Sequence, residues 1–295
     1  MATDVNGKGK GSNTSRWLKL LFKTGITVLC FYYISTRIDL TKTLEAAYQA
    51  NWLVLIPALT LFLFSKLFSA IRLNINFRNI GLNLPQGKNM KLYWLGMFYN
   101  LFLPGAISGD VYKVVLLNRK YKTSYKKASA AVLLDRFSGV LALGFLLSIY
   151  GMAILEHPYY DTILAGGTLL AFTGYYFVVK YLFPYLLPGF FPTLLWGLAV
   201  QFLQVVCIYC ILAGIGIPIR QHEWIFIFLA SAVISILPVS LGGGLGTREL
   251  VFAEGALFFS LNPQTGVVIS LLFYMITVIA SLWGLYYNFN DPLKE

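Results

Sequence analysis

The sequence has little charge, and very little of that charge is acidic. Of its 295 residues, 12 are Asp or Glu and 23 are Lys or Arg, and charged residues make up 12% of the chain. A soluble globular domain carries about twice that charged fraction. The scarcity of charge therefore excludes an ordinary soluble enzyme.

Histidine and cysteine are also scarce, with two and three residues in the chain. His157 and His222 fall on connections between apolar segments, and no carboxylate or Cys is spaced to complete a metal site with them. Cys30, Cys207 and Cys210 lie inside apolar runs, without the further ligands or βαβ context that metal or redox chemistry requires. We therefore expect no metal and no cofactor.

Apolar residues are abundant. They make up 58% of the chain, aromatic residues make up 16%, and the mean hydropathy is +0.69. Roughly 18 consecutive apolar residues are enough to span a bilayer as a helix. The basic residues behind the net charge of +11 cluster between apolar segments, which indicates cytoplasmic loops rather than a nucleic-acid surface. The sequence predicts an all-α, polytopic membrane protein that does not bind nucleic acid.

The hydropathy pattern divides the chain into a tail and a membrane domain. Residues 1–15 are predicted to be a flexible cytoplasmic tail, and residues 16–290 an integral membrane domain. About six spanning helices are expected, near residues 17–35, 51–71, 128–155, 162–179, 193–213 and 265–289. The connection after the second segment is basic and is therefore expected to be cytoplasmic, which places the N-terminus in the cytoplasm as well. Its basic residues are Arg72, Arg78, Lys88 and Lys91. The membrane is expected to be the inner membrane of a bacterium.

Two further apolar stretches are broken by Pro and Gly. The stretch 92–109 is interrupted at Leu103-Pro104-Gly105, and the stretch from Trp224 to Leu241 runs into Pro238 and a glycine-rich loop. Each is predicted to form a re-entrant hairpin. The two Leu-Pro pairs are 134 residues apart, which favours an inverted repeat of about 16–156 and 160–290. In transporters such paired breaks mark the substrate site.

Charged and small polar residues gather where each hairpin returns. The N-terminus of a helix offers free N–H groups and a partial positive charge, so an anion could bind between two such ends. A guanidinium suits phosphate because it engages two oxygens at once, which makes Arg248 the first choice as ligand. Ser108 and Thr247 are expected N-caps. The predicted headgroup site comprises Arg248, Lys113, Asp110, Ser108, Thr247, Gly244 and Gly246, with Gly242 and Gly243 in the same loop.

Four other charged residues are predicted to have coupling or structural roles. Asp135 and Arg136 lie about nine residues into a predicted span, some 13 Å deep at about 1.5 Å per residue, where each charge costs roughly 2.5–3.5 kcal/mol. Since adjacent helix positions diverge by about 100°, the two are expected to contact different neighbours. Glu249 and Glu254 either orient Arg248, carry protons, or form a structural ion pair with it.

Three motifs together resemble a known family. They are Asn100-Leu-Phe-Leu-Pro-Gly-Ala-Ile-Ser-Gly-Asp110-Val-Tyr-Lys113, then Ala128-x-x-Ala131-x-x-x-x-Asp135-Arg136-x-x-Gly139, and then Leu237-Pro-Val-Ser-x-Gly-Gly-Gly-Leu-Gly246-Thr-Arg248-Glu249. Their order and spacing are similar to the transmembrane region of lysylphosphatidylglycerol synthases and of stand-alone flippase-like relatives. The resemblance implies a membrane domain that moves lipids between leaflets. Fused members carry an aminoacyl-transferase domain, which we do not expect here.

The leading functional hypothesis is therefore a lipid flippase rather than an enzyme. Its expected substrate is an anionic phospholipid or a polyprenyl phosphate. Two alternatives remain open at the level of sequence. One is a scaffold or regulator of a separate lipid synthase or glycosyltransferase, and the other is a membrane enzyme that acts on lipid phosphates. The sequence does not define an oligomeric state.

Overall fold

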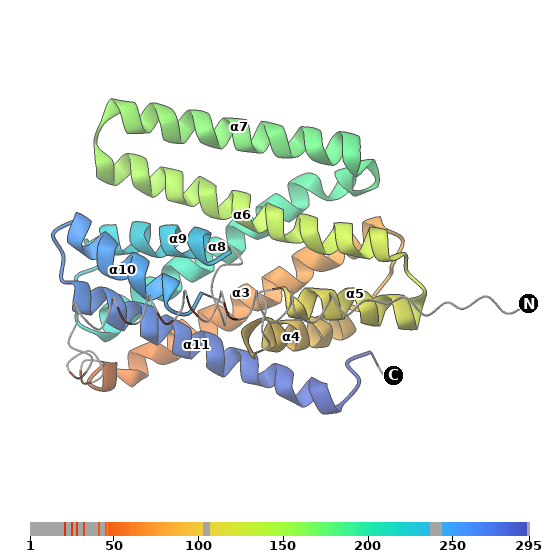
Figure 1. Ribbon diagram of the computed structural model, residues 1–295, viewed down its shortest axis with the longest axis horizontal. Helices are drawn as coiled ribbons and strands as arrows, with labels where there is room; N and C mark the ends of the chain where they lie inside the picture. Colours follow the sequence, from red (N-terminus) through yellow and green to blue (C-terminus); the bar gives the residue numbers. More distant parts are fainter. Residues whose placement is uncertain are drawn as a thin grey trace, which may run out of the picture.

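The computed structural model describes residues 47–102, 107–236 and 244–293, with a few isolated positions before residue 47. Within these ranges the protein is all-α, as predicted (Figure 1). Its helices are α3 (Trp52–Asn79), α4 (Gln86–Phe102), α5 (Ser108–Tyr121), α6 (Tyr125–Leu155), α7 (Pro158–Leu182), the 3-10 helix η1 (Pro184–Gly189), α8 (Phe190–Gly214), α9 (Glu223–Ile236), α10 (Thr247–Phe258) and α11 (Pro263–Phe289).

Five segments of the described chain are long and apolar enough to cross a membrane: α3, α6, α7, η1 with α8, and α11. They match five of the six predicted spans. The first predicted span, 17–35, and the tail, 1–15, lie outside the described residues, so the count of six stays a prediction. The segment α3 extends beyond the predicted end at residue 71 and continues to Asn79.

Local sequence explains where several helices begin. The Asn51 side chain accepts a hydrogen bond from the N–H of Leu53 at the start of α3. Asn262 caps α11 in the same way through the N–H of Gln264, and Pro263 occupies the first helical position, where its missing N–H costs nothing. Asn side chains therefore cap the N-termini of both α3 and α11.

The helices of the two halves of the chain make the same set of contacts. Helices α3 and α8 pack together extensively and run in opposite directions (Figure 1). Helix α4 packs on α11 as α9 packs on α6, and α5 packs on α6 as α10 packs on α11. Exchanging α3, α4, α5 and α6 for α8, α9, α10 and α11 thus preserves the contacts, as an internal repeat requires.

The C-termini of α3 and α8 repeat one another in detail. Gly81 and Gly216 follow them with φ values of 82° and 75°. Beyond each glycine the next N–H reaches back five residues, from Leu82 to the Phe77 carbonyl and from Ile217 to the Leu212 carbonyl, at 2.9 Å in both cases. This is the Schellman arrangement, in which a left-handed residue reverses the chain. The two stops correspond to one another when α3 is exchanged for α8.

Alanine at either stop is expected to lower the free energy of unfolding by about 1 kcal/mol, because a left-handed residue with a Cβ is strained by roughly 1–2 kcal/mol. A Cβ at Gly81 or Gly216 would meet no other atom within 4 Å. The loss of stability therefore reports backbone strain alone, without a steric clash. Gly174→Ala within α7, also in open space, is the control and should be neutral or stabilising. Unfolding titrations in detergent measure all three; unequal losses at the two stops would contradict their equivalence.

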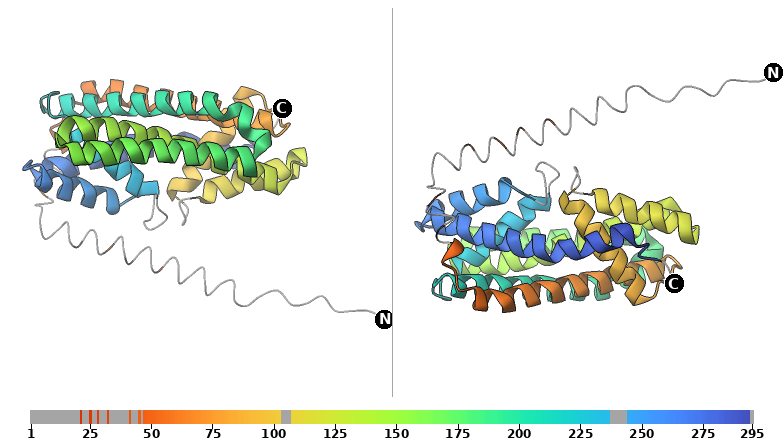
Figure 2. Two further views of the ribbon diagram at one scale, coloured as in Figure 1. Left: turned by 90° about the horizontal axis from the view of Figure 1, so that it is seen from above. Right: turned by 90° about the horizontal axis from the view of Figure 1, so that it is seen from below.

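The helix pairs α4–α5 and α9–α10, for which the sequence predicts hairpins, approach each other from opposite ends of the molecule. Figure 2 shows α4 with α5 at one end of the long axis and α9 with α10 at the other, with the C-terminal ends of α4 and α9 towards the middle. The breaks themselves, residues 103–106 and 237–243, lie outside the described residues. Gly242 and Gly243 belong to the second break.

Candidate functional site

A polar cavity of about 290 Å³ lies where α3, α4, α5, α6, α8 and α9 come together. Its lining includes Asn100 near the end of α4 and Ile236 at the end of α9, so it adjoins the ends of both hairpins. Its charged and polar lining residues are Lys66, Ser69, Arg72, Tyr93, Asn100, Asp110, Lys113, Asp135, Arg136, Gln201 and Gln204. Most of the charges inside the helical bundle therefore line a single cavity.

One buried ion pair fixes the cavity wall between α3 and α6. Arg72 donates from Nε to Asp135 Oδ1 at 2.8 Å and from Nη2 to Oδ2 at 3.2 Å. Both residues are only 6% exposed. A Cβ on Gly139 would lie 2.8 Å from Arg72 Nη1, so the glycine one turn beyond Asp135 makes room for the guanidinium. The Nη1 atom is buried and has no hydrogen-bond partner among the described residues.

A second cluster joins α5 to α6 through Asp110. The carboxylate accepts from Lys113 Nζ at 3.0 Å through Oδ1 and from Arg136 Nε through Oδ2. Lys113 is 4% exposed, and its ammonium lies 4.7 Å from the centre of the Tyr93 ring. Asp135 and Arg136 thus contact different partners, as their divergence on one helix predicts. One carboxylate is shared by two cations.

The lining is positively charged overall. Four cationic side chains face two carboxylates, which leaves an excess of two positive charges. Lys66 contributes without an ion pair, since no carboxylate in the described ranges lies within salt-bridge distance of it, and its ammonium sits 4.3 Å from the centre of the Phe62 ring. A cavity of this kind is suited to an anionic group.

Helix α5 approaches α4 very closely at this site. A Cβ on Gly109 would lie 1.9 Å from the Gly96 carbonyl oxygen, and a Cβ on Gly96 would lie 2.0 Å from Lys113 Cε. Small residues allow helix backbones to come this close. The two glycines therefore set where Lys113 sits in the cavity wall.

Arg248 of α10 lies close enough to Lys66 of the cavity lining for their charges to repel, although it does not line the cavity itself. The guanidinium carbon of Arg248 lies 5.0 Å from the centre of the Phe273 ring. Arg248, Thr247, Gly244 and Gly246 do not line the cavity described above. The structure therefore brings together only Lys113 and Asp110 of the predicted headgroup set with the deep residues Asp135 and Arg136, and the role of Arg248 as phosphate ligand stays a prediction.

Both predicted N-caps are wrong. Helix α5 has Ile107 at its N-cap position, and the N–H of Gly109 donates instead to Asn100 Oδ1 on α4 at 2.8 Å. Ser108 is already the first helical residue. At α10 the N-cap is Gly246. Ser108 and Thr247 each follow the N-cap position by one residue, so their hydroxyls do not cap the first N–H groups of the helix. Side chains from other positions accept hydrogen bonds at both helix starts.

Thr247 and Glu249 both hold the start of α10. The Thr247 hydroxyl donates to the Gly244 carbonyl at 3.0 Å. Glu249 accepts the Gly246 N–H at 2.7 Å through one oxygen and the Ser270 hydroxyl at 3.0 Å through the other. This is the carboxylate half of a capping box. Of the roles left open for Glu249, the geometry favours a structural one.

The remaining candidates of the second hairpin lie elsewhere. Gly244 has φ 103°, and a Cβ there would lie 2.5 Å from Ser235 Oγ, so its small size accommodates α9. Glu254 lies on the exposed side of α10. At least one glycine of the glycine-rich loop, Gly244, is therefore required for packing against α9.

Lys66 and Arg72 of α3 were missed as site residues. Lys66 lies within the predicted span 51–71. A charged residue inside an apolar run is the sequence signal that could have identified it as a site residue. Arg72 was assigned to a cytoplasmic loop, and that assignment is wrong: the helix continues for seven more residues and Arg72 is buried in it. Its partner Asp135 is 63 residues away, which no local pattern reveals.

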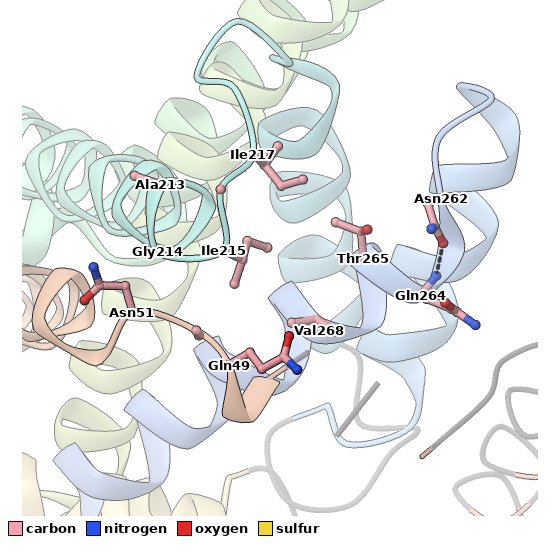
Figure 3. A pocket seen from close by; sticks show the side chains of 12 residues that line it. Gln49, Asn51, Ala213, Gly214, Ile215, Ile217, Asn262, Gln264, Thr265 and Val268 are labelled. Atoms are coloured by element: carbon pink, nitrogen blue, oxygen red, sulfur yellow. Dashed lines mark hydrogen bonds between the residues drawn. The ribbon is translucent and has the colours of Figure 1, made fainter. Parts of the chain in front are cut away.

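A larger pocket of about 570 Å³ lies at one end of the molecule (Figure 3). It is lined by neutral groups from the start of α3, the α8–α9 connection and the start of α11, and one of its amides, Asn262, is engaged in capping. Without a charged lining residue, it offers no counter-ion to an anion. The central cavity is the stronger candidate site.

These features define a multi-pass integral membrane protein with a charged cavity among its helices. The chain belongs to the family described as the lysylphosphatidylglycerol synthase TM region, whose sequence model matches residues 20–192. It is also similar to the UPF0104 membrane protein PH1989 of Pyrococcus horikoshii, with 21% identity over an alignment of 317 positions that covers 90% of this chain and 92% of the relative. The predicted family is confirmed.

Proposed function

We propose that this protein binds an anionic, phosphate-containing lipid and moves it between the leaflets of the cytoplasmic membrane, with its N-terminus in the cytoplasm, and that it performs no covalent chemistry. The observation that carries the proposal is the central cavity, in which four cations face two carboxylates. Unpaired positive charge is expensive inside a membrane protein and marks substrate pathways. An anionic headgroup is the ligand that would balance it.

Three of the four cations have a distinct part in this proposal. Lys113 and Arg136 share Asp110, so a phosphate oxygen can replace the carboxylate as acceptor for either of them. Arg72 is held by Asp135, yet its Nη1 still has a proton to donate. Charge-assisted bonds from guanidinium and ammonium groups to phosphate are among the strongest hydrogen bonds available. Together they offset the loss of headgroup hydration.

The repeated contacts of the two halves suggest how access alternates. Helices α3 and α8 pack extensively on each other, and the two hairpins approach from opposite ends. We interpret both hairpins as re-entrant. Rocking one half against the other around the cavity would expose it to one leaflet and then to the other, as in transporters built from inverted repeats.

The test is a leaflet-assignment assay with purified protein in vesicles that contain phosphatidylglycerol. We expect the wild-type protein to accelerate lipid transfer over empty vesicles. Lys113→Gln is expected to slow it about tenfold or more, because a hydrogen bond to a charged group contributes about 1.5–3 kcal/mol and each 1.4 kcal/mol is about tenfold. Lys126→Gln removes the same charge from an exposed position of α6 outside the cavity and is the control.

Two outcomes contradict the proposal. Transfer no faster than in empty vesicles would exclude transport, and equal rates for Lys113→Gln and Lys126→Gln would exclude the cavity as the headgroup site. Stable co-purification with a lipid synthase or glycosyltransferase, together with tolerance of the Lys113 change, would instead support a scaffold. New lipid species on thin-layer analysis would indicate an enzyme.

A further inference from the structure

An apolar groove of about 330 Å³ runs between α6, α7 and α9. Apart from two hydroxyl residues, its lining is aliphatic, aromatic or glycine: Val140, Leu141, Gly144, Phe145, Leu147, Ile163, Leu164, Gly167, Ala171, Phe172 and Val233. Helix α7 packs mainly on α6 and η1, with Tyr175 and Tyr176 in contact with Phe190 at the start of α8, and it lies at the edge of the molecule (Figure 1). The groove is therefore on the periphery of the bundle.

The two hydroxyl groups in the groove are already engaged with protein atoms. Ser148 Oγ donates to the Gly144 carbonyl at 2.9 Å and lies 2.7 Å from Thr168 Oγ1. A hydroxyl has one proton to give, so Thr168 is the donor to Ser148. The groove thus presents a surface that hydrocarbon can cover without leaving polar groups unsatisfied.

The groove is bounded because α6 and α7 meet at both ends. Near one end a Cβ on Gly151 would lie 2.8 Å from Leu164 Cδ1. Towards the other, the Tyr175 hydroxyl donates to the Leu134 carbonyl at 3.1 Å. Between these contacts Gly144 and Gly167 have no atom within 4 Å of the place where a Cβ would stand. The helices touch at both ends and at the Ser148–Thr168 contact, and they leave space beside Gly144 and Gly167.

The groove adjoins the charged cavity. Val140 of α6 lines both of them, and Gly139 beside it lines the cavity next to Arg72. A charged cavity beside an apolar groove matches an amphipathic molecule, with its anionic group in one and its chain in the other. A soluble anion would need only the cavity.

We infer that the groove between α6, α7 and α9 binds a hydrocarbon chain of the lipid whose phosphate occupies the cavity. This inference rests on the proposed function and adds a second site to it. The chain stays in contact with protein while the headgroup is bound, which orients the lipid along α6. The chain is surrounded by hydrocarbon in the bilayer as well, so its contact with the groove depends on packing rather than on removal from water.

The experiment fills the groove from inside. Gly144→Leu and Gly167→Leu place side chains in its open part, and neither meets an atom within 4 Å at Cβ, so both should fold. Gly166→Leu and Gly174→Leu are the controls, since they stand in open space on α7 and do not line the groove. We expect the groove variants to move phosphatidylglycerol at least fivefold more slowly than the controls and to bind water-soluble glycerophosphoglycerol as well as the wild type does.

A second measurement separates the groove from transport itself. Phosphatidylglycerol with a photoreactive group on one chain is expected to crosslink to peptides of α6 and α7, and Gly167→Leu should abolish this crosslink while Gly166→Leu keeps it. Crosslinking by a wild-type protein that moves no lipid would support the groove and overturn the proposed transport. Equal transfer and equal crosslinking in groove and control variants would overturn the groove while transport stands.

Discussion

Replacing Asp135 with alanine is expected to lower the free energy of unfolding by about 3–5 kcal/mol. Asp135 holds Arg72 through two hydrogen bonds in a setting where both residues are 6% exposed. Removing one partner of a buried ion pair leaves the other charge uncompensated, which is far costlier than losing the attraction alone. Unfolding titrations in detergent measure the loss.

An exposed ion pair provides the matched control. Asp291 binds Lys120 at 3.0 Å, with side chains 45% and 34% exposed, and Asp291→Ala is expected to cost less than about 1 kcal/mol. The double change Arg72→Met with Asp135→Leu should recover much of the loss, because neither of these two positions then buries a charge. If Asp135→Ala lowered the free energy of unfolding no more than Asp291→Ala does, the ion pair between Arg72 and Asp135 would not stabilise the fold.

The second large effect is expected at Gly109. Its Cβ would fall 1.9 Å from the Gly96 carbonyl oxygen, and since both helix backbones are involved, α4 and α5 must separate. We expect Gly109→Ala to cost about 3 kcal/mol, at the upper end for overpacking, and to move Lys113 out of the cavity wall. Thermal unfolding together with the vesicle transfer assay measures both effects.

Gly96→Ala distinguishes packing from positioning at the same contact. A Cβ there would meet Lys113 Cε at 2.0 Å, which is part of a flexible side chain that can move aside. We expect a smaller loss of stability than for Gly109→Ala, with a comparable loss of lipid transfer. If Gly96→Ala left transfer unchanged, the position of the Lys113 ammonium would not matter for function.

The pattern of apolar segments was enough to predict the architecture. Spans of apolar residues are long and independent of tertiary context, and paired Leu-Pro breaks indicated which segments correspond. The contacts of α3, α4, α5 and α6 with their counterparts then agree with a repeat. The first predicted span and both breaks lie outside the described residues, so their form stays a prediction.

The site was only half predictable, for physical reasons. Lys113 and Asp110 belong to a local motif, and the divergence of Asp135 and Arg136 follows from helix geometry. Arg72 was misplaced because hydropathy declines before α3 ends, although a buried arginine can be retained when a distant carboxylate pairs with it. The N-caps failed because Asn100 and Glu249 reach the helix starts from other positions.

The most direct test of the central claim asks whether a lipid phosphate sits in the cavity. Solid-state NMR can measure dipolar coupling between lipid phosphorus and lysine side-chain nitrogen in phosphatidylglycerol bilayers. We predict a phosphorus at hydrogen-bonding distance from Lys113 Nζ, with a signal that Lys113→Gln removes and Lys126→Gln leaves intact. A Lys113 resonance without coupling to phosphorus, or a coupling assigned to that resonance which persists in Lys113→Gln, would contradict the account.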